Sequence, residues 1–280
     1  MDNKPIIHLT DRIFTDYSGI KRLFEFYHNA RQYYNTTIYL DFYHLDWFDA
    51  NLSALFGCIL SKLNSENNLV FSTDLNFLEE KFNVLFRNGF LNSDKLIIDE
   101  HQSTVSFQNF NSTDKVGFVN YIENDLLKHR GMPPFSEDLK ESILMNLIEV
   151  YNNIQIHSKS NEDFYVCGQY YPSKEVLIFT LVDVGIGFLP AIKLKTNDNI
   201  TDNYSAILWA LEKGNSTKLS CPGGLGLSDL YNYFKSSNGD LQIITGDTFW
   251  AIELENTVIK SYNFKSPFVG SILNLVFRYK

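Results

Sequence analysis

Short apolar runs alternate with helical spacing in the N-terminal part of the chain. Residues 37–42 and 68–72 are runs of apolar and β-branched side chains that predict strands. Residues 49–63 have helical hydrophobic spacing, and residues 76–88 predict a second helix. The apolar face of the first helix comprises Leu52, Leu55, Phe56, Ile59 and Leu63. The order strand, helix, strand, helix predicts a small α/β domain whose sheet is covered by helices.

The C-terminal part has longer elements. A helical stretch precedes the breaker at residues 131–134, and Ser136 is a good N-cap for a long amphipathic helix. The stretch from residue 188 to residue 222 is polar and irregular apart from one short helix. The predicted helices are 116–130, 136–156, 205–213 and 225–236, and the predicted strands are 164–171, 176–182, 240–244, 248–255 and 272–279.

A polar, broken stretch at residues 107–113 separates these two parts and is interpreted as a linker. We therefore expect two domains, residues 1–112 and 113–280, and an α/β (α+β) fold class.

Composition narrows the class of protein. The 280 residues are 44% hydrophobic and 20% charged, as in packed globular proteins, and the net charge of −9 argues against a broad nucleic-acid surface. The N-terminus lacks the apolar core of a signal peptide, and no apolar run approaches the ~20 residues of a membrane helix. Cys58, Cys167 and Cys221 form no metal-type pairs, so reduced thiols are the simplest interpretation. We expect a cytoplasmic protein without nucleic-acid or membrane partners.

Two polar side chains, Glu149 and Asn153, stand four residues apart in the long predicted helix and so share one face. The amide oxygen of Asn153 can ligate a hard cation such as Mg²⁺, while the carboxylate of Glu149 can orient or deprotonate a nucleophile. The alternative is an ordinary solvated face of an amphipathic helix.

Two glycine-rich turns follow. In Asp183-Val-Gly-Ile-Gly187, a carboxylate ends an apolar strand, where an adenine amino group could hydrogen-bond it. Gly185 and Gly187 allow close backbone approach. In Gly223-Gly-Leu-Gly-Leu227, successive N–H groups precede a helix and can face an anion. The alternatives are a turn-capping Asp and a plain flexible loop, and no Walker pattern occurs.

The order of these motifs resembles that of GHKL-type ATPases and kinases. Residues 141–157 resemble the N box of that family, and residues 183–187 and 223–227 resemble its two glycine boxes. The polar segment 188–222 corresponds to its ATP lid. Near the C-terminus, residues 268–272 resemble its Gly-Thr strand with Ser271 in place of threonine, and residues 246–248 compete for that assignment. The resemblance covers about residues 115–280 and implies an α/β sandwich, a mixed sheet with helices on one face.

The resemblance also implies roles for individual residues. Asn153 is expected to ligate magnesium, and Glu149 to act as the base or to orient a water molecule. Asp183 is expected to bind the adenine amino group. The remaining expected ATP contacts are Gly185, Gly187, Lys218, Gly223, Gly224, Leu225, Gly226 and Ser271.

The N-terminal part resembles the STAS domains of anti-sigma-factor antagonists. Residues 39–42 and 45–49 followed by a helix match their strand and turn, after which those domains have a phosphorylated serine. Here the corresponding position is Asn51, which cannot be phosphorylated, and Ser53 is two residues away. The resemblance thus implies an interaction role for residues 1–112.

Together these features favour an ATP-binding regulator that uses Mg²⁺ and acts on an unidentified protein partner; the arrangement is also compatible with a homodimer. One alternative is an interaction module that binds ATP without transferring phosphate, and another is a serine/threonine kinase of a STAS-type partner. His129 lacks the sequence context of a histidine-kinase phosphoacceptor, so autophosphorylation there is not expected.

Overall fold

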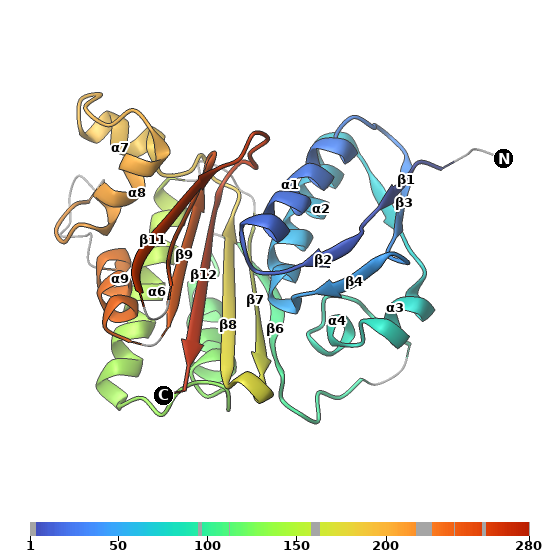
Figure 1. The fold of residues 1–280 in the computed structure, drawn as a ribbon, viewed down its shortest axis with the longest axis horizontal. Coiled ribbons are helices and arrows are strands. Elements are labelled where there is room, and N and C mark those ends of the chain that lie inside the picture. Colours follow the sequence, from blue (N-terminus) through green and yellow to red (C-terminus); the bar gives the residue numbers. More distant parts are fainter. Residues whose placement is uncertain are drawn as a thin grey trace.

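The protein is a mixed α/β structure in which a large sheet lies between two groups of helices (Figure 1). The computed structural model describes residues 4–94, 97–111, 113–157, 163–216, 226–237, 239–253 and 256–279, without the side chains of residues 153–157 and 256–259. Within these ranges, no helix has the length and apolar character needed to cross a membrane.

The N-terminal part has two small parallel sheets. Strands β1 (Ile6–His8), β3 (Thr37–Asp41) and β5 (Val70–Ser72) form the first, in the order β1-β3-β5. Strands β2 (Asp11–Ile13) and β4 (Leu45–Phe48) form the second. The helical elements of this part are α1 (Tyr17–Ala30), η1 (Ala50–Leu52), α2 (Ser53–Asn67), α3 (Leu75–Lys81) and α4 (Val84–Arg87).

The C-terminal part is built on a seven-stranded sheet in the order β11-β10-β9-β12-β8-β7-β6. Its strands are β6 (Thr104–Phe110), β7 (Phe164–Tyr171), β8 (Val176–Asp183), β9 (Asp240–Thr245), β10 (Thr248–Glu253), β11 (Asn256–Asn263) and β12 (Ser271–Arg278). Its helical elements are α5 (Lys115–Tyr121), η2 (Ile122–Leu126), α6 (Glu137–His157), η3 (Pro172–Lys174), α7 (Leu189–Lys195), α8 (Asn203–Leu211) and α9 (Gly226–Ser236).

The structure corrects two expectations about this sheet. Every described neighbouring pair is antiparallel, so the expected mixed sheet is wrong. The expected linker at residues 107–113 is also wrong up to residue 110, because β6 pairs with β7 there. A sheet edge accommodates such a polar strand because one side of it stays solvated. The division at residue 112 remains a prediction, although β6, which precedes it, belongs to the larger sheet.

Helices cover both faces of the large sheet. On one face, α6 and α9 pack over residues such as Leu181, Ile243 and Leu273. On the other face, α1 and α2 of the N-terminal part share a hydrophobic core with alternate residues such as Val182 and Ile272. Strand residues alternate between faces, so each strand supplies both cores. The helices of the C-terminal part lie on one face as expected, and the N-terminal part covers the opposite face (Figure 1).

A ring of buried hydrogen bonds joins the two parts. Asn51 donates from Nδ2 to Thr180 Oγ1 on β8 at 2.8 Å, and Thr180 Oγ1 donates to Asn274 Oδ1 on β12 at 2.8 Å. Asn274 Nδ2 donates to Gln242 Oε1 on β9 at 2.8 Å, and Gln242 Nε2 donates to the carbonyl oxygen of Thr15 at 3.1 Å. Asn51 Nδ2 also donates to Thr15 Oγ1 at 2.9 Å, which closes the ring.

The Asp49 carboxylate supports this ring from the N-terminal side. It accepts from the backbone N–H of Thr15 at 2.6 Å, from Trp47 Nε1 at 2.7 Å and from Tyr171 Oη at 2.6 Å. Burial, together with the nearby Asp49 carboxylate, raises the pKa of Tyr171, so its hydroxyl remains a donor. With a further hydrogen bond from Thr15 Oγ1 at 2.9 Å, four donors compensate this buried carboxylate for its lost hydration.

The ring predicts the effect of Asn51→Leu, a change of similar volume. The leucine leaves the hydroxyl groups of Thr15 and Thr180 without their amide donor in a buried site, so the free energy of unfolding should fall by about 1–3 kcal/mol. Urea unfolding measures the loss, with Asn76→Leu on the exposed side of α3 as the control. A variant as stable as wild type would show that the ring does not hold the two parts together.

Candidate functional site

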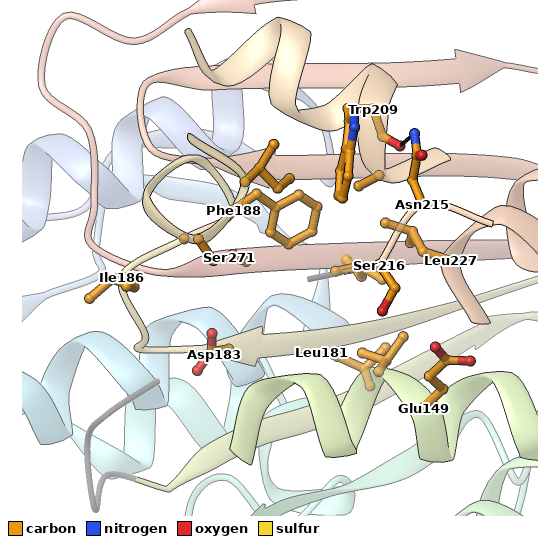
Figure 2. Close-up of a pocket in the computed structure, with 16 residues that line it drawn as sticks. Glu149, Leu181, Asp183, Ile186, Phe188, Trp209, Asn215, Ser216, Leu227 and Ser271 are labelled. Atoms are coloured by element: carbon orange, nitrogen blue, oxygen red, sulfur yellow. Dashed lines mark hydrogen bonds between the residues drawn. The ribbon is translucent and has the colours of Figure 1, made fainter. Parts of the chain in front are cut away.

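A hollow of about 970 Å³ of empty space, open to solvent, lies over one face of the large sheet. Figure 2 shows its floor on β8 and β12, with α6 on one side and α8 on the other. The residues that line it are Glu149, Val150, Leu181, Asp183, Ile186, Gly187, Phe188, Ala191, Ile192, Trp209, Ala210, Asn215, Ser216, Leu227, Ser271 and Leu273. The mainly apolar lining with a few polar groups is typical of small-molecule sites.

Strand register fixes the floor. Leu181 and Asp183 on β8 are two residues apart, as are Ser271 and Leu273 on β12, so all four side chains belong to the same face of the sheet. Ser271 is the direct partner of Asp183 in the pairing of these two strands. The carboxylate therefore stands at the end of an apolar floor, with a hydroxyl group beside it.

The turn after Asp183 is held by two hydrogen bonds. Asp183 Oδ1 accepts from the backbone N–H of Gly185 at 2.9 Å, and Thr245 Oγ1 accepts from the backbone N–H of Phe188 at 3.0 Å. Gly187 has a φ of +75°, and a Cβ there would lie 2.7 Å from Thr245 Oγ1. This position therefore requires glycine, and Thr245 positions the turn at the rim of the hollow.

The backbone of Gly270, just before β12, lies close to the backbone at the end of β8. Its φ is +124°, and a Cβ there would lie 1.9 Å from the backbone oxygen of Asp183. Ser271 then donates from Oγ to Thr245 Oγ1 at 3.3 Å. The glycine thus allows the start of β12 to lie directly against the end of β8.

Glu149 lies on α6 at the other end of the hollow and is partly buried. Its Oε2 accepts from the backbone N–H of Gly226, the first residue of α9, at 2.8 Å. A Cβ on Gly226 would lie 2.8 Å from Glu149 Cβ, so glycine allows α9 to approach α6 this closely. A carboxylate at a helix N-terminus is favourably placed relative to the helix dipole.

The structure brings several residues predicted from the sequence to one hollow. Glu149, Asp183, Gly187 and Ser271 line it, and the N–H groups of Gly185 and Gly226 bond to the two carboxylates. Of the two competing Gly-Thr matches, the one with Ser271 supplies a lining residue, whereas Thr248 is not part of the lining.

Some predicted contacts lie outside the described residues. These are Lys218, Gly223, Gly224 and Leu225, together with the side chain of Asn153. Among the side chains that the structure describes, no three His, Cys, Asp or Glu residues gather in a cluster of metal-binding type. The roles given to these residues stay predictions.

Sequence reasoning missed other residues of the site. Phe188, Trp209 and Asn215 line the hollow, and Thr245 lies behind its glycine turn. The first three belong to the stretch interpreted as a variable lid, in which no pattern distinguishes one aromatic residue from another. Thr245 directly follows the strand predicted at residues 240–244, and only the pairing of β9 with β12 shows its proximity to Ser271.

No protein-family model and no curated protein significantly matches this chain.

The close approach at Gly270 predicts a large effect of Gly270→Ala. The new methyl group meets backbone rather than a movable side chain, so the ends of β8 and β12 must separate. Gly214→Ala is the matched control, because its φ is also positive, at +89°, but nothing lies within 4 Å of its Cβ position. We expect the control to lose about 1–2 kcal/mol of stability from backbone strain alone.

In urea unfolding, Gly270→Ala should lose at least about 2 kcal/mol more than the control, since overpacking adds to the strain. Equal losses in the two variants would contradict the proposed role of this contact in building the site.

Proposed function

We propose that this hollow binds ATP and that the C-terminal part is a nucleotide-binding domain of the GHKL type. The observation that carries the proposal is the convergence of Glu149, Asp183 and Ser271 on a single hollow. These residues come from α6, β8 and β12, and each belongs to a motif resembling one of that family. The N-terminus of α9 lies beside Glu149 and donates its first N–H group to that carboxylate.

The lining suits the base of the nucleotide. Leu181 and Leu273 give the floor an apolar surface, and the carboxylate of Asp183 stands at the end of it. A carboxylate accepts hydrogen bonds only, so it suits the exocyclic amino group of adenine. It disfavours guanine, which carries a carbonyl oxygen at that ring position. Gly187 lines the hollow beside this carboxylate, and its missing Cβ makes room for Thr245 behind the turn.

The other end of the hollow suits chemistry on the phosphates. When bound, Mg²⁺ supplies positive charge to the phosphate oxygens, and in this proposal Asn153 holds it. Glu149 orients the attacking water or hydroxyl group and accepts its proton. Its hydrogen bond to the N–H of Gly226 fixes the carboxylate relative to α9.

One observation favours a second candidate, a module that binds ATP and changes its partner surface without turnover. The carboxylate of Glu149 already stabilises the N-terminus of α9, so the residue has a structural role that does not require catalysis. In this case the nucleotide acts by stabilising one arrangement of the surrounding segments.

We further propose that the N-terminal part is a STAS-like interaction domain that is docked intramolecularly. Asn51, which the resemblance equates with the phosphoacceptor, has no exposed surface and bonds to Thr180, and Ser53 is also fully buried. Phosphorylation of Ser53 in the folded protein is therefore disfavoured, and Asn51 has no hydroxyl group to accept a phosphate. A kinase activity would act on a separate protein, and the buried, unbridged Cys58 and Cys167 suit a reducing cytoplasm.

Calorimetric titration with Mg-ATP tests the proposal. Wild type should bind, and Asp183→Asn should weaken ATP binding at least about tenfold, because the amide presents an N–H donor or one fewer acceptor to the adenine. Asp138→Asn on the exposed first turn of α6 is the control and should leave the affinity unchanged. Absence of nucleotide binding by wild type would refute the proposed function.

Measuring ATP hydrolysis or phosphate transfer by the Glu149→Gln variant separates the two candidate functions. The glutamine keeps an oxygen that can accept from the N–H of Gly226, so ATP binding should persist. If Glu149 is the base, turnover should fall about 100-fold or more. Turnover that is unaffected would exclude Glu149 as the base, and binding without turnover in wild type would favour the interaction module.

A further inference from the structure

Helix α8 is anchored to the body of the protein at its N-terminus. Asp202 caps it by accepting from the backbone N–H of Ser205 at 2.8 Å. Asn203 then donates from Nδ2 to Asp247 Oδ1, in the turn between β9 and β10, at 2.8 Å. A side chain that α8 directs into the hollow is therefore held at a fixed height above the sheet.

Burial along α8 also anchors the helix to the body of the protein. Ala206, Ile207 and Leu211 are buried, and the helix contacts α9, β9 and β10. At its C-terminal end, the backbone oxygen of Trp209 accepts from Asn215 Nδ2 at 2.9 Å, so the residues that follow fold back onto the helix. This helix is thus a fixed wall of the hollow, although the sequence places it within the expected lid.

Trp209 gives this wall an aromatic surface. It is partly exposed and lines the hollow together with Ala210. Figure 2 shows Trp209 on the side of the hollow opposite Leu181 and Asp183, with Phe188 also on that side. The hollow therefore has an apolar floor, an aromatic opposite wall and a carboxylate at one end.

We propose that Trp209 is the base-contacting residue of this wall and that the ligand it selects carries a planar heteroaromatic base. The inference rests on the proposed nucleotide function and adds a residue that the sequence motifs do not single out. The indole of Trp209 offers a large, polarisable face to a purine, and such stacking tolerates small changes in ring position. Asp183 then reads the amino group at the edge of the ring.

The chemistry of the lining favours a base over a lipid chain. An acyl chain would fill the apolar part but leave the carboxylate of Asp183 against hydrocarbon, which is costly. A purine satisfies the polar end with its ring edge and the apolar walls with its two faces. A planar base with an exocyclic amino group therefore matches both ends of the hollow.

Trp209→Leu tests the inference with ATP and inorganic tripolyphosphate as probes. Loss of stacking should weaken ATP binding between about fivefold and 100-fold, the equivalent of about 1–3 kcal/mol. Binding of tripolyphosphate should not change, because it has no base. Trp209→Phe should restore most of the ATP affinity, while Tyr34→Leu, on the exposed surface of the N-terminal part, should leave the wild-type ATP affinity unchanged.

Tryptophan fluorescence tests the contact directly in a protein that keeps Trp209. In the Trp47→Phe protein, the remaining tryptophans are the fully buried Trp250 and Trp209. ATP should quench the emission, tripolyphosphate should not, and Trp209→Phe in the same background should abolish the ATP signal.

The outcomes separate this inference from the proposed function. If wild type binds ATP and Asp183→Asn weakens binding, but Trp209→Leu binds ATP as wild type does, the role of Trp209 is refuted and the proposed function stands. The same conclusion follows if ATP binds without any change in fluorescence. If wild type does not bind ATP, both proposals fail.

Discussion

The buried hydrogen-bond ring between the N-terminal part and the large sheet is the constraint on which the rest of the structure depends. Its members are Thr15, Asn51, Thr180, Gln242 and Asn274, and each would be costly in a buried site without its partners. Hydrophobic contact alone permits sliding between apolar faces, whereas hydrogen bonds require one register. The ring therefore defines how α1 and α2 lie on the sheet and removes Asn51 from solvent.

The same three strands carry a second polar row. Thr180, Asn274 and Gln242 are aligned across β8, β12 and β9, and Asp183, Ser271 and Thr245 are aligned three residues nearer one end. Three residues of a strand span roughly 10 Å and change the face. One row thus faces the N-terminal part while the other forms the rim of the hollow. A shift of register in any of the three strands would disrupt both rows at once.

Much of this arrangement could be predicted from the sequence. Hydrophobic spacing predicted α2, α6, α9 and the β7–β8 hairpin, and motif order predicted that Glu149, Asp183 and Ser271 would share a site. Strand β6 was mistaken for a linker because an edge strand with one solvated side has no clear hydrophobic pattern. The docking of α1 and α2, and the positions of Thr245 and Trp209, depend on contacts between segments distant in sequence, which local patterns do not encode.

The central proposal is that Asp183, at the end of β8, binds the adenine base of ATP. A crystal structure of the full chain with magnesium and a non-hydrolysable ATP analogue tests it most directly. The account predicts the adenine amino group within hydrogen-bond distance of an Asp183 carboxylate oxygen, the ring between the strand floor and Trp209, and Asn153 at the metal. A nucleotide bound elsewhere, or one whose base points away from Asp183, would contradict it.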